Sequence, residues 1–153
     1  MQARQHWPSL TPESFVETSP VDHFYNCAAH AADDNDKPWW PSLARGYYWP
    51  PDVPRTANLA SFEAAYATKG YERCENPDLE EEVEKIAVYA LDGVPKHVAR
   101  QLASGRWTSK LGDLKDIDHA TLDDLAGPGY GHPVLFMRRP RAQEDARQAT
   151  GIR

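Results

Sequence analysis

The apolar positions along the chain change their periodicity between its first and second halves. Within residues 58–70, Leu59, Phe62 and Tyr66 recur at helical spacing between a capping asparagine and a glycine, which predicts a helix. Residues 85–91 are instead apolar at nearly every position, a pattern typical of a central strand covered on both faces. We therefore expect helices first and a sheet afterwards.

A β-hairpin is predicted after this central strand, with its turn near Gly105. The two strands are expected over residues 96–102 and 106–111. A two-residue turn pairs Leu102 with Trp107, and we favour it because both side chains are apolar. A three-residue turn would shift the register and place Ser109 on the face of His97 instead.

Shorter elements complete the expected domain. The alanine-rich residues after Cys27 favour a short helix that ends by about Asp33, where a run of acidic side chains begins. Short strands are expected over residues 71–74 and 133–137, and a helical piece over residues 121–125. The chain divides into an irregular leader at residues 1–23, a single domain at residues 24–140 and a flexible tail at residues 141–153. The fold class expected is α+β, with N-terminal helices packed on an antiparallel sheet.

Composition narrows the classes of partner. The chain has 153 residues and a net charge of -6, which disfavours nucleic acid and anionic membranes as partners. We find no apolar run long enough to span a bilayer and no signal-peptide pattern near the start, so we expect a cytoplasmic protein. The two cysteines are expected to be reduced. The sequence does not indicate an oligomeric state.

No cofactor or metal is predicted. The glycine-rich segment at residues 127–131 lacks the lysine and the strand-to-helix context of a phosphate loop. His23, Cys27 and His30 stand at helical spacing and are the weak alternative, a zinc site. No second pair of ligands accompanies them.

Aromatic and proline residues crowd the segment between residues 38 and 51. Three interpretations remain open for it: a loop anchored in the core, the wall of a groove, or a recognition surface. The candidate binding residues are Trp39, Trp40 and Trp49, together with Gln101 from the later hairpin.

Cys27 and His97 are the residue types that a thiol nucleophile and its base require. A helix N-terminus favours the thiolate, and a nearby imidazole can take up its proton. The alternatives are ordinary: a cysteine among alanines is often a small buried hydrophobe, and a strand histidine is often a surface residue.

Further groups could complete such a site. Asn26 and the Cys27 backbone amide are candidates for stabilising an oxyanion. A third group should orient the imidazole. The candidates near the hairpin are Gln101, Thr108, Ser109 and Lys110.

Several short motifs together resemble an uncharacterised, mostly bacterial family of small proteins. They are Asn26-Cys27, Trp39-Trp40-Pro41, Trp49-Pro50, Gly70-Tyr71-Glu72-x-Cys74, His97-x-Ala99-Arg100-Gln101, Trp107 to Gly112 and Tyr130-Gly131. A looser resemblance is to the papain-like superfamily, especially its cell-wall amidase branch. That resemblance implies a cysteine on an N-terminal helix, here Cys27, and a histidine on the following sheet, here His97.

Two functions from different classes follow. The first is a cysteine-dependent hydrolase that acts on the amide bond of a peptide or amide substrate, as a peptidase, amidase or deamidase, with Cys27 and His97 as its dyad. The alternative is a non-catalytic protein-binding or immunity-type domain that meets a protein partner through its Trp/Tyr/Pro-rich segment.

Overall fold

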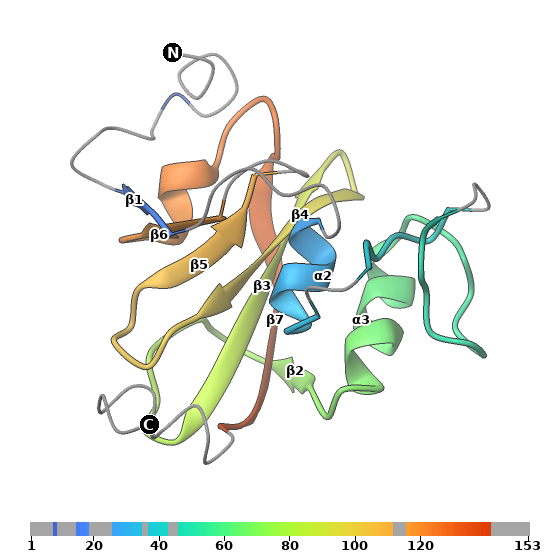
Figure 1. Cartoon of the computed structure of the whole chain (residues 1–153), viewed down its shortest axis with the longest axis horizontal. Coiled ribbons are helices and arrows are strands. Elements are labelled where there is room, and N and C mark those ends of the chain that lie inside the picture. Colours follow the sequence, from blue (N-terminus) through green and yellow to red (C-terminus); the bar gives the residue numbers. More distant parts are fainter. Residues whose placement is uncertain are drawn as a thin grey trace.

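The computed structural model of the chain describes residues 8, 15–18, 26–34, 37–42, 46–111 and 116–141. A seven-stranded sheet lies at its centre, every neighbouring pair is antiparallel, and the strand order is β1-β6-β5-β4-β3-β7-β2. The strands are β1 (Phe15–Glu17), β2 (Glu72–Cys74), β3 (Val83–Leu91), β4 (Val94–Gln101), β5 (Trp107–Lys110), β6 (Asp116–His119) and β7 (His132–Pro140). The helices of the described residues are α2 (Cys27–Ala31), α3 (Leu59–Ala67) and the 3-10 helix η1 (Leu122–Leu125) (Figure 1).

The α+β, papain-like arrangement expected from the sequence is wrong. The described chain is mostly antiparallel sheet, and α2 and α3 have only five and nine residues. The helix after Cys27 stops early because Asp33 adopts a left-handed conformation with φ 62°. Residues 15–17, within the expected leader, and residues 116–119, expected to be irregular, are short strands that pair with each other.

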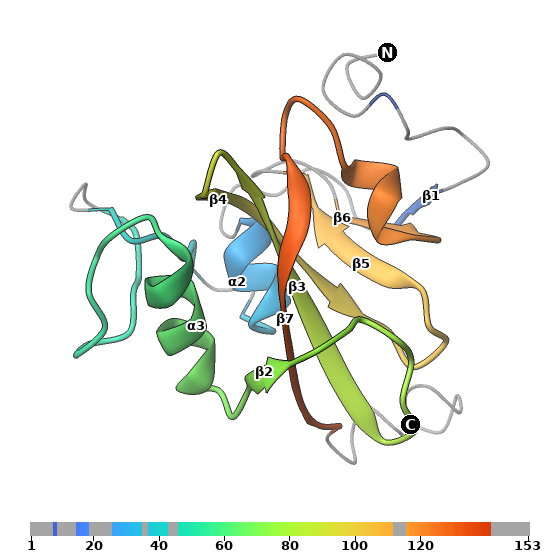
Figure 2. The same cartoon turned by 180° about the vertical axis from the view of Figure 1, so that it is seen from behind.

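Strand β3 divides the interior into two cores. Its residues 84–90 are all buried, because successive side chains of a strand point to opposite faces of the sheet and both faces are covered. Ile86 and Val88 enter a first core with α2 and α3, whereas Ala87 and Tyr89 enter a second core with η1. Figure 1 shows α2 lying across β3 and β4, and Figure 2 shows the sheet from behind, with η1 beside β6.

Several of the expected elements are confirmed, among them the short strands near residues 71–74 and 133–137 and the helical piece near residues 121–125, which are β2, β7 and η1. The capping residue Asn58 accepts a hydrogen bond from the Ser61 amide at 2.8 Å and starts α3, whose Phe62 and Tyr66 side chains are fully buried in the first core. Strand β3 lies between two neighbours and contains residues 85–91.

The preferred register of the hairpin is wrong, and the three-residue turn is present. The Leu102 amide donates to the Arg106 carbonyl at 2.7 Å, and Gln101 pairs with Trp107. Gly105, with φ 93°, supplies the left-handed residue that a three-residue hairpin loop needs. The apolar pairing was misleading because Trp107 packs into the second core while Leu102 stays half-buried.

The loop that precedes β7 is closed tightly on itself. Gly127 and Gly131 exchange two backbone hydrogen bonds, of 2.9 and 2.7 Å. Gly131 has φ 76°, and a Cβ atom at this position would lie 2.0 Å from the Ala90 carbonyl oxygen. The backbone of β3 and this loop therefore approach more closely than any side chain allows.

We expect Gly131→Ala to lower the free energy of unfolding by about 3 kcal/mol or more, because it adds a backbone clash to an unfavourable φ. Gly93→Ala is the matched control: Gly93 has φ 81° but open space around its Cβ position, so it should lose only about 1–2 kcal/mol. Urea unfolding of both variants measures the difference. Equal losses would contradict the close approach.

Candidate functional site

Cys27 is the first residue of α2 and lies against β4. Its side chain is 4% exposed and hydrogen-bonds to the backbone of Val98. Burial is the main cause that raises the pKa of the thiol to about 11. The sulfur is therefore protonated near neutral pH, the opposite of what an activated nucleophile needs.

Asn26 joins α2 to the aromatic segment. Its Oδ1 accepts from the amides of Ala29 at 3.1 Å and Trp39 at 2.9 Å, while its Nδ2 donates to the Trp39 carbonyl at 2.7 Å. The Asn26 side chain therefore caps α2 through the Ala29 amide and also bonds to both the amide and the carbonyl of Trp39, as a neighbouring strand would. These bonds engage the amide nitrogen that was expected to face an oxyanion.

His97 points to the face of the sheet opposite to α2. Along β4, Val98 belongs to the first core with α2, and Ala99 belongs to the second core. The His97 ring packs against Tyr89 and Tyr130 of that second side, with centroid separations of 5.3 and 4.2 Å. The sheet lies between Cys27 and His97, so the structure does not bring the expected dyad together.

The partner of His97 is Ser109, as the three-residue turn requires. His97 Nε2 lies 3.0 Å from Ser109 Oγ, which lies 2.8 Å from His119 Nε2. The Nδ1 atom of His119 lies 2.9 Å from the Thr121 carbonyl oxygen. We call this row of groups the histidine–serine chain; it crosses β4, β5 and β6.

The protons of the histidine–serine chain follow from its one fixed acceptor. The Thr121 carbonyl can only accept, so Nδ1 of neutral His119 carries the proton and its Nε2 accepts from Ser109. The hydroxyl proton of Ser109 is then used, and His97 Nε2–H donates to the serine oxygen. His97 Nδ1 is left as a buried lone pair without a hydrogen-bond partner among the described residues.

Both histidines of this chain are held neutral. Burial is the first cause that lowers the pKa of His97 well below 6.5, and His119 and His30 add to it. Burial also lowers the pKa of His119, although the Thr121 carbonyl opposes it. His97, Ser109 and His119 are all 0% exposed.

A second polar group lies on the α2 face of the same strands. His30 Nε2 is 2.7 Å from Thr108 Oγ1, and its Nδ1 is 3.8 Å from Asp116 Oδ2. The ammonium of the fully buried Lys110 lies 3.7 Å from Asp116 Oδ1. Lys110 therefore neutralises Asp116 on the face opposite to His97 and does not orient that imidazole.

Sequence reasoning missed Asp116 and His119. It named His30 only in the zinc alternative and Thr108 only as a candidate partner of His97. The signal was present in residues 116–119, where the buried Ile117 stands between polar side chains in the alternation of a strand.

The candidate binding residues are mostly buried. Trp39 and Trp49 are 0% and 2% exposed, and their indole nitrogens donate to Asp34 and to the Pro54 carbonyl at 3.0 Å each. Trp40 is half-buried against Phe62. The fourth candidate, Gln101, is 2% exposed and donates to the Pro77 carbonyl at 3.0 Å.

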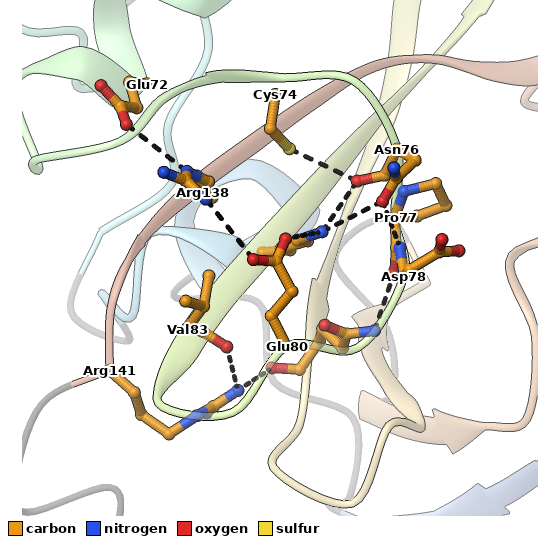
Figure 3. A network of polar contacts seen from close by, with 11 residues as sticks. Glu72, Cys74, Asn76, Pro77, Asp78, Glu80, Val83, Arg138 and Arg141 are labelled. Carbon is orange, nitrogen blue, oxygen red and sulfur yellow. Dashed lines mark hydrogen bonds and ion pairs between the residues drawn. The ribbon is translucent and has the colours of Figure 1, made fainter.

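A hollow of about 480 Å³ opens at the edge of the sheet where β2, β3 and β7 meet. It is lined by Gly70, Glu72, Glu81, Glu82, Val83, Arg138, Arg139 and Pro140. Its arginines are engaged: Arg138 reaches Glu72 and Glu80 at 3.4 Å each (Figure 3), and Arg139 lies 2.7 Å from the buried Glu84. None of the expected site residues lines this hollow.

A network of polar contacts ties the segment between β2 and β3 to the sheet beside this hollow. The Lys85 ammonium, 1% exposed, lies 2.7 Å from Glu80 and donates to the Asn76 carbonyl at 3.0 Å. The Cys74 thiol donates to the same carbonyl at 3.4 Å (Figure 3). The contacts of Lys85 give the buried ammonium of a central strand its hydrogen-bond and ion-pair partners, so they have a structural role.

Two negative findings concern the described part of the chain. Within it, no group of three or more His, Cys, Asp or Glu side chains is arranged to hold a metal ion; His23 of the zinc alternative lies outside it. No helix within the same residues is long and apolar enough to cross a membrane.

The fold and these clusters define a small domain with a single antiparallel sheet and polar groups buried on both of its faces. A family model described as Domain of unknown function (DUF7689) matches residues 16–138, and the chain belongs to this family. The expectation of an uncharacterised family is confirmed. No curated protein and no solved structure gave a match.

We expect iodoacetamide to modify Cys74 of the folded protein at least about tenfold faster than Cys27, because burial keeps Cys27 protonated and covered. Cys74 is half-buried and on a sheet edge. Peptide mass spectrometry after timed labelling measures both rates, and labelling in denaturant is the control in which the two rates converge. Faster labelling at Cys27, slowed by His97→Ala, would instead support the dyad.

Proposed function

We propose that this domain acts by binding a protein partner through the outer side of its aromatic segment, residues 37–56. The observation that carries the proposal is that some aromatic side chains of the segment are buried and others are exposed to solvent. Trp39 and Trp49 are buried anchors, whereas Tyr47 is 41% exposed and Trp40 and Tyr48 are half-buried. The burial of Trp39 and Trp49 leaves Trp40, Tyr47 and Tyr48 as the aromatic side chains of the segment that a partner could contact.

The two arms of the segment are fastened to each other. The Trp40 amide donates to the Tyr48 carbonyl at 3.0 Å, and the Tyr48 amide donates to the Pro38 carbonyl at 2.8 Å. The rings of Trp39 and Tyr48 pack at 5.0 Å, and the Asn26 side chain holds the Trp39 backbone. Exposed aromatics on so constrained a backbone lose little conformational entropy when they meet a partner.

The position of the segment also supports a binding role. The segment lies beside α3, at one side of the molecule and away from the strands of the sheet (Figure 1). Tyrosine and tryptophan are enriched among the residues that dominate binding energy at protein interfaces. Thiol catalysis has weaker support, because it would need Cys27 and His97 to meet across the sheet and a thiolate where burial favours the thiol.

Affinity purification of the tagged chain from the cells that produce it should recover a partner, and Tyr47→Ala should weaken that complex at least about tenfold. Trp40→Ala should act in the same direction. Val134→Ala is the matched control, because Val134 is 50% exposed on β7, outside the segment, and it should change the dissociation constant by less than about twofold.

Cys27→Ser should bind the partner as the wild type does, once urea unfolding has shown that it folds. Failure to recover any partner would overturn the proposal. A partner whose affinity is unchanged by both Tyr47→Ala and Trp40→Ala would overturn it equally.

A further inference from the structure

We propose that the loop at residues 127–131 is an acid-sensitive cover, which lifts Tyr130 off His97 as the pH falls and admits water to the histidine–serine chain. The proposal concerns the second core and is independent of the aromatic segment. It rests on three features of the described residues: a ring stacked directly on His97, a buried Nδ1 atom of His97 without a hydrogen-bond partner, and a loop that lies outside the strand ladders and is closed by the Gly127–Gly131 pair.

Tyr130 is the lid of the histidine–serine chain. Its ring lies parallel to the His97 imidazole, with centroids 4.2 Å apart and planes inclined by 4°. It also leans on Tyr89 at 6.3 Å. Among the described residues, Tyr89 of β3 and Ser109 of β5 also contact the His97 ring, and both belong to strands. Tyr130 is therefore the neighbour of His97 that can move without breaking the sheet.

Every N–H and O–H donor of the histidine–serine chain has an acceptor only while both histidines are neutral. A proton added to His97 would create an Nδ1–H donor, and no acceptor for it exists among the described residues. A proton added to His119 would give Ser109 a second donor. Ser109 Oγ would then either accept from both rings and leave its own O–H without these acceptors, or donate to His97 Nε2 and force a proton onto the same Nδ1. Either route ends with a buried donor that only water can satisfy.

The described charged and titratable groups around the histidine–serine chain do not offset the cost of protonating His97. Tyr89 and Tyr130 face it from β3 and the loop, His119 from β6, and His30 of α2 from across the sheet. Arg106, Asp118 and Asp124 surround His119 instead. Within the part of the chain that the structure describes, the ionisable groups that act on the pKa of His97 are thus histidines, with no carboxylate among them.

The loop is the part of this region that opens at the lowest cost. Gly127 and Gly131 close it through two mutual hydrogen bonds, whereas β3 is paired with strands on both sides. Local opening is favoured where few backbone bonds must break. Hydration of His97 therefore requires movement of residues 127–131 and leaves the β3 ladder in place.

The direction of the pH dependence follows from linkage. The closed form binds fewer protons than the open form, so it is favoured above the ordinary histidine pKa of about 6.5 and is progressively lost below it. One histidine with an ordinary pKa in the open form raises the opening constant roughly tenfold between about pH 7.5 and about pH 5.5.

Amide hydrogen exchange, corrected for the intrinsic effect of pH on exchange, measures this opening. The Gly131 amide, which donates to Gly127, should lose roughly tenfold in protection over that pH interval, while amides within β3 keep theirs. His97→Phe retains a flat ring under Tyr130 and removes the titrating group, so it should abolish the dependence. His132→Phe, at an exposed histidine of β7, is the matched control and should retain it.

A second measurement needs no change at His97. In the wild type, the NMR titration of the His97 ring should show a pKa below 6.5, and Tyr130→Leu should raise it towards the ordinary value, because coupling between protonation and opening is reciprocal. Protection of Gly131 that is independent of pH would overturn the proposal. Equal loss of protection in β3 would do so too, since it would mean global unfolding, and so would an ordinary pKa for His97 beneath an intact Tyr130.

Discussion

The pleat of β3 and β4 is the constraint on which the rest of this structure depends. Because both faces of the central strands are covered, each side chain is assigned by its parity to one of two cores on opposite faces of the sheet. Val98 belongs to α2 and the aromatic segment, and His97, one residue earlier, belongs to Tyr130 and β6. A single step along the backbone separates two different chemical environments.

This parity explains how the candidate site was misjudged. The expected dyad needed a cysteine at the start of a helix and a histidine on a later strand. The chain has both, in that order. Whether Cys27 and His97 share a face depends on which face of β4 packs against α2, and that face carries Val98. The turn at Gly105 decides only that Ser109 shares the face of His97. The three-residue turn that brought Ser109 to His97 was weighed and set aside, because one apolar pair, Leu102 with Trp107, outweighed it.

The fold was predictable where local signals were strong and long. Asn58 with its helical apolar spacing and the nearly unbroken apolar run of β3 were both read correctly. The class was wrong because the strands that were not expected are short: β1 has three residues and β6 has four. Their pairing is with distant segments. For example, Phe15 lies opposite His119, which no local pattern in a single sequence encodes.

The place of β7 in the sheet has a consequence for synthesis. Among the described strands β7 comes latest in the sequence, yet it lies between β3 and β2. One whole edge of β3, the most apolar strand, is therefore unpaired until residues 132–140 are available. A ribosome releases the chain from its N-terminus, and an unpaired apolar edge is a template for association with other chains. Until β7 emerges, the nascent protein presents that edge. A truncation that removes β7 should therefore promote aggregation rather than leave a smaller folded domain.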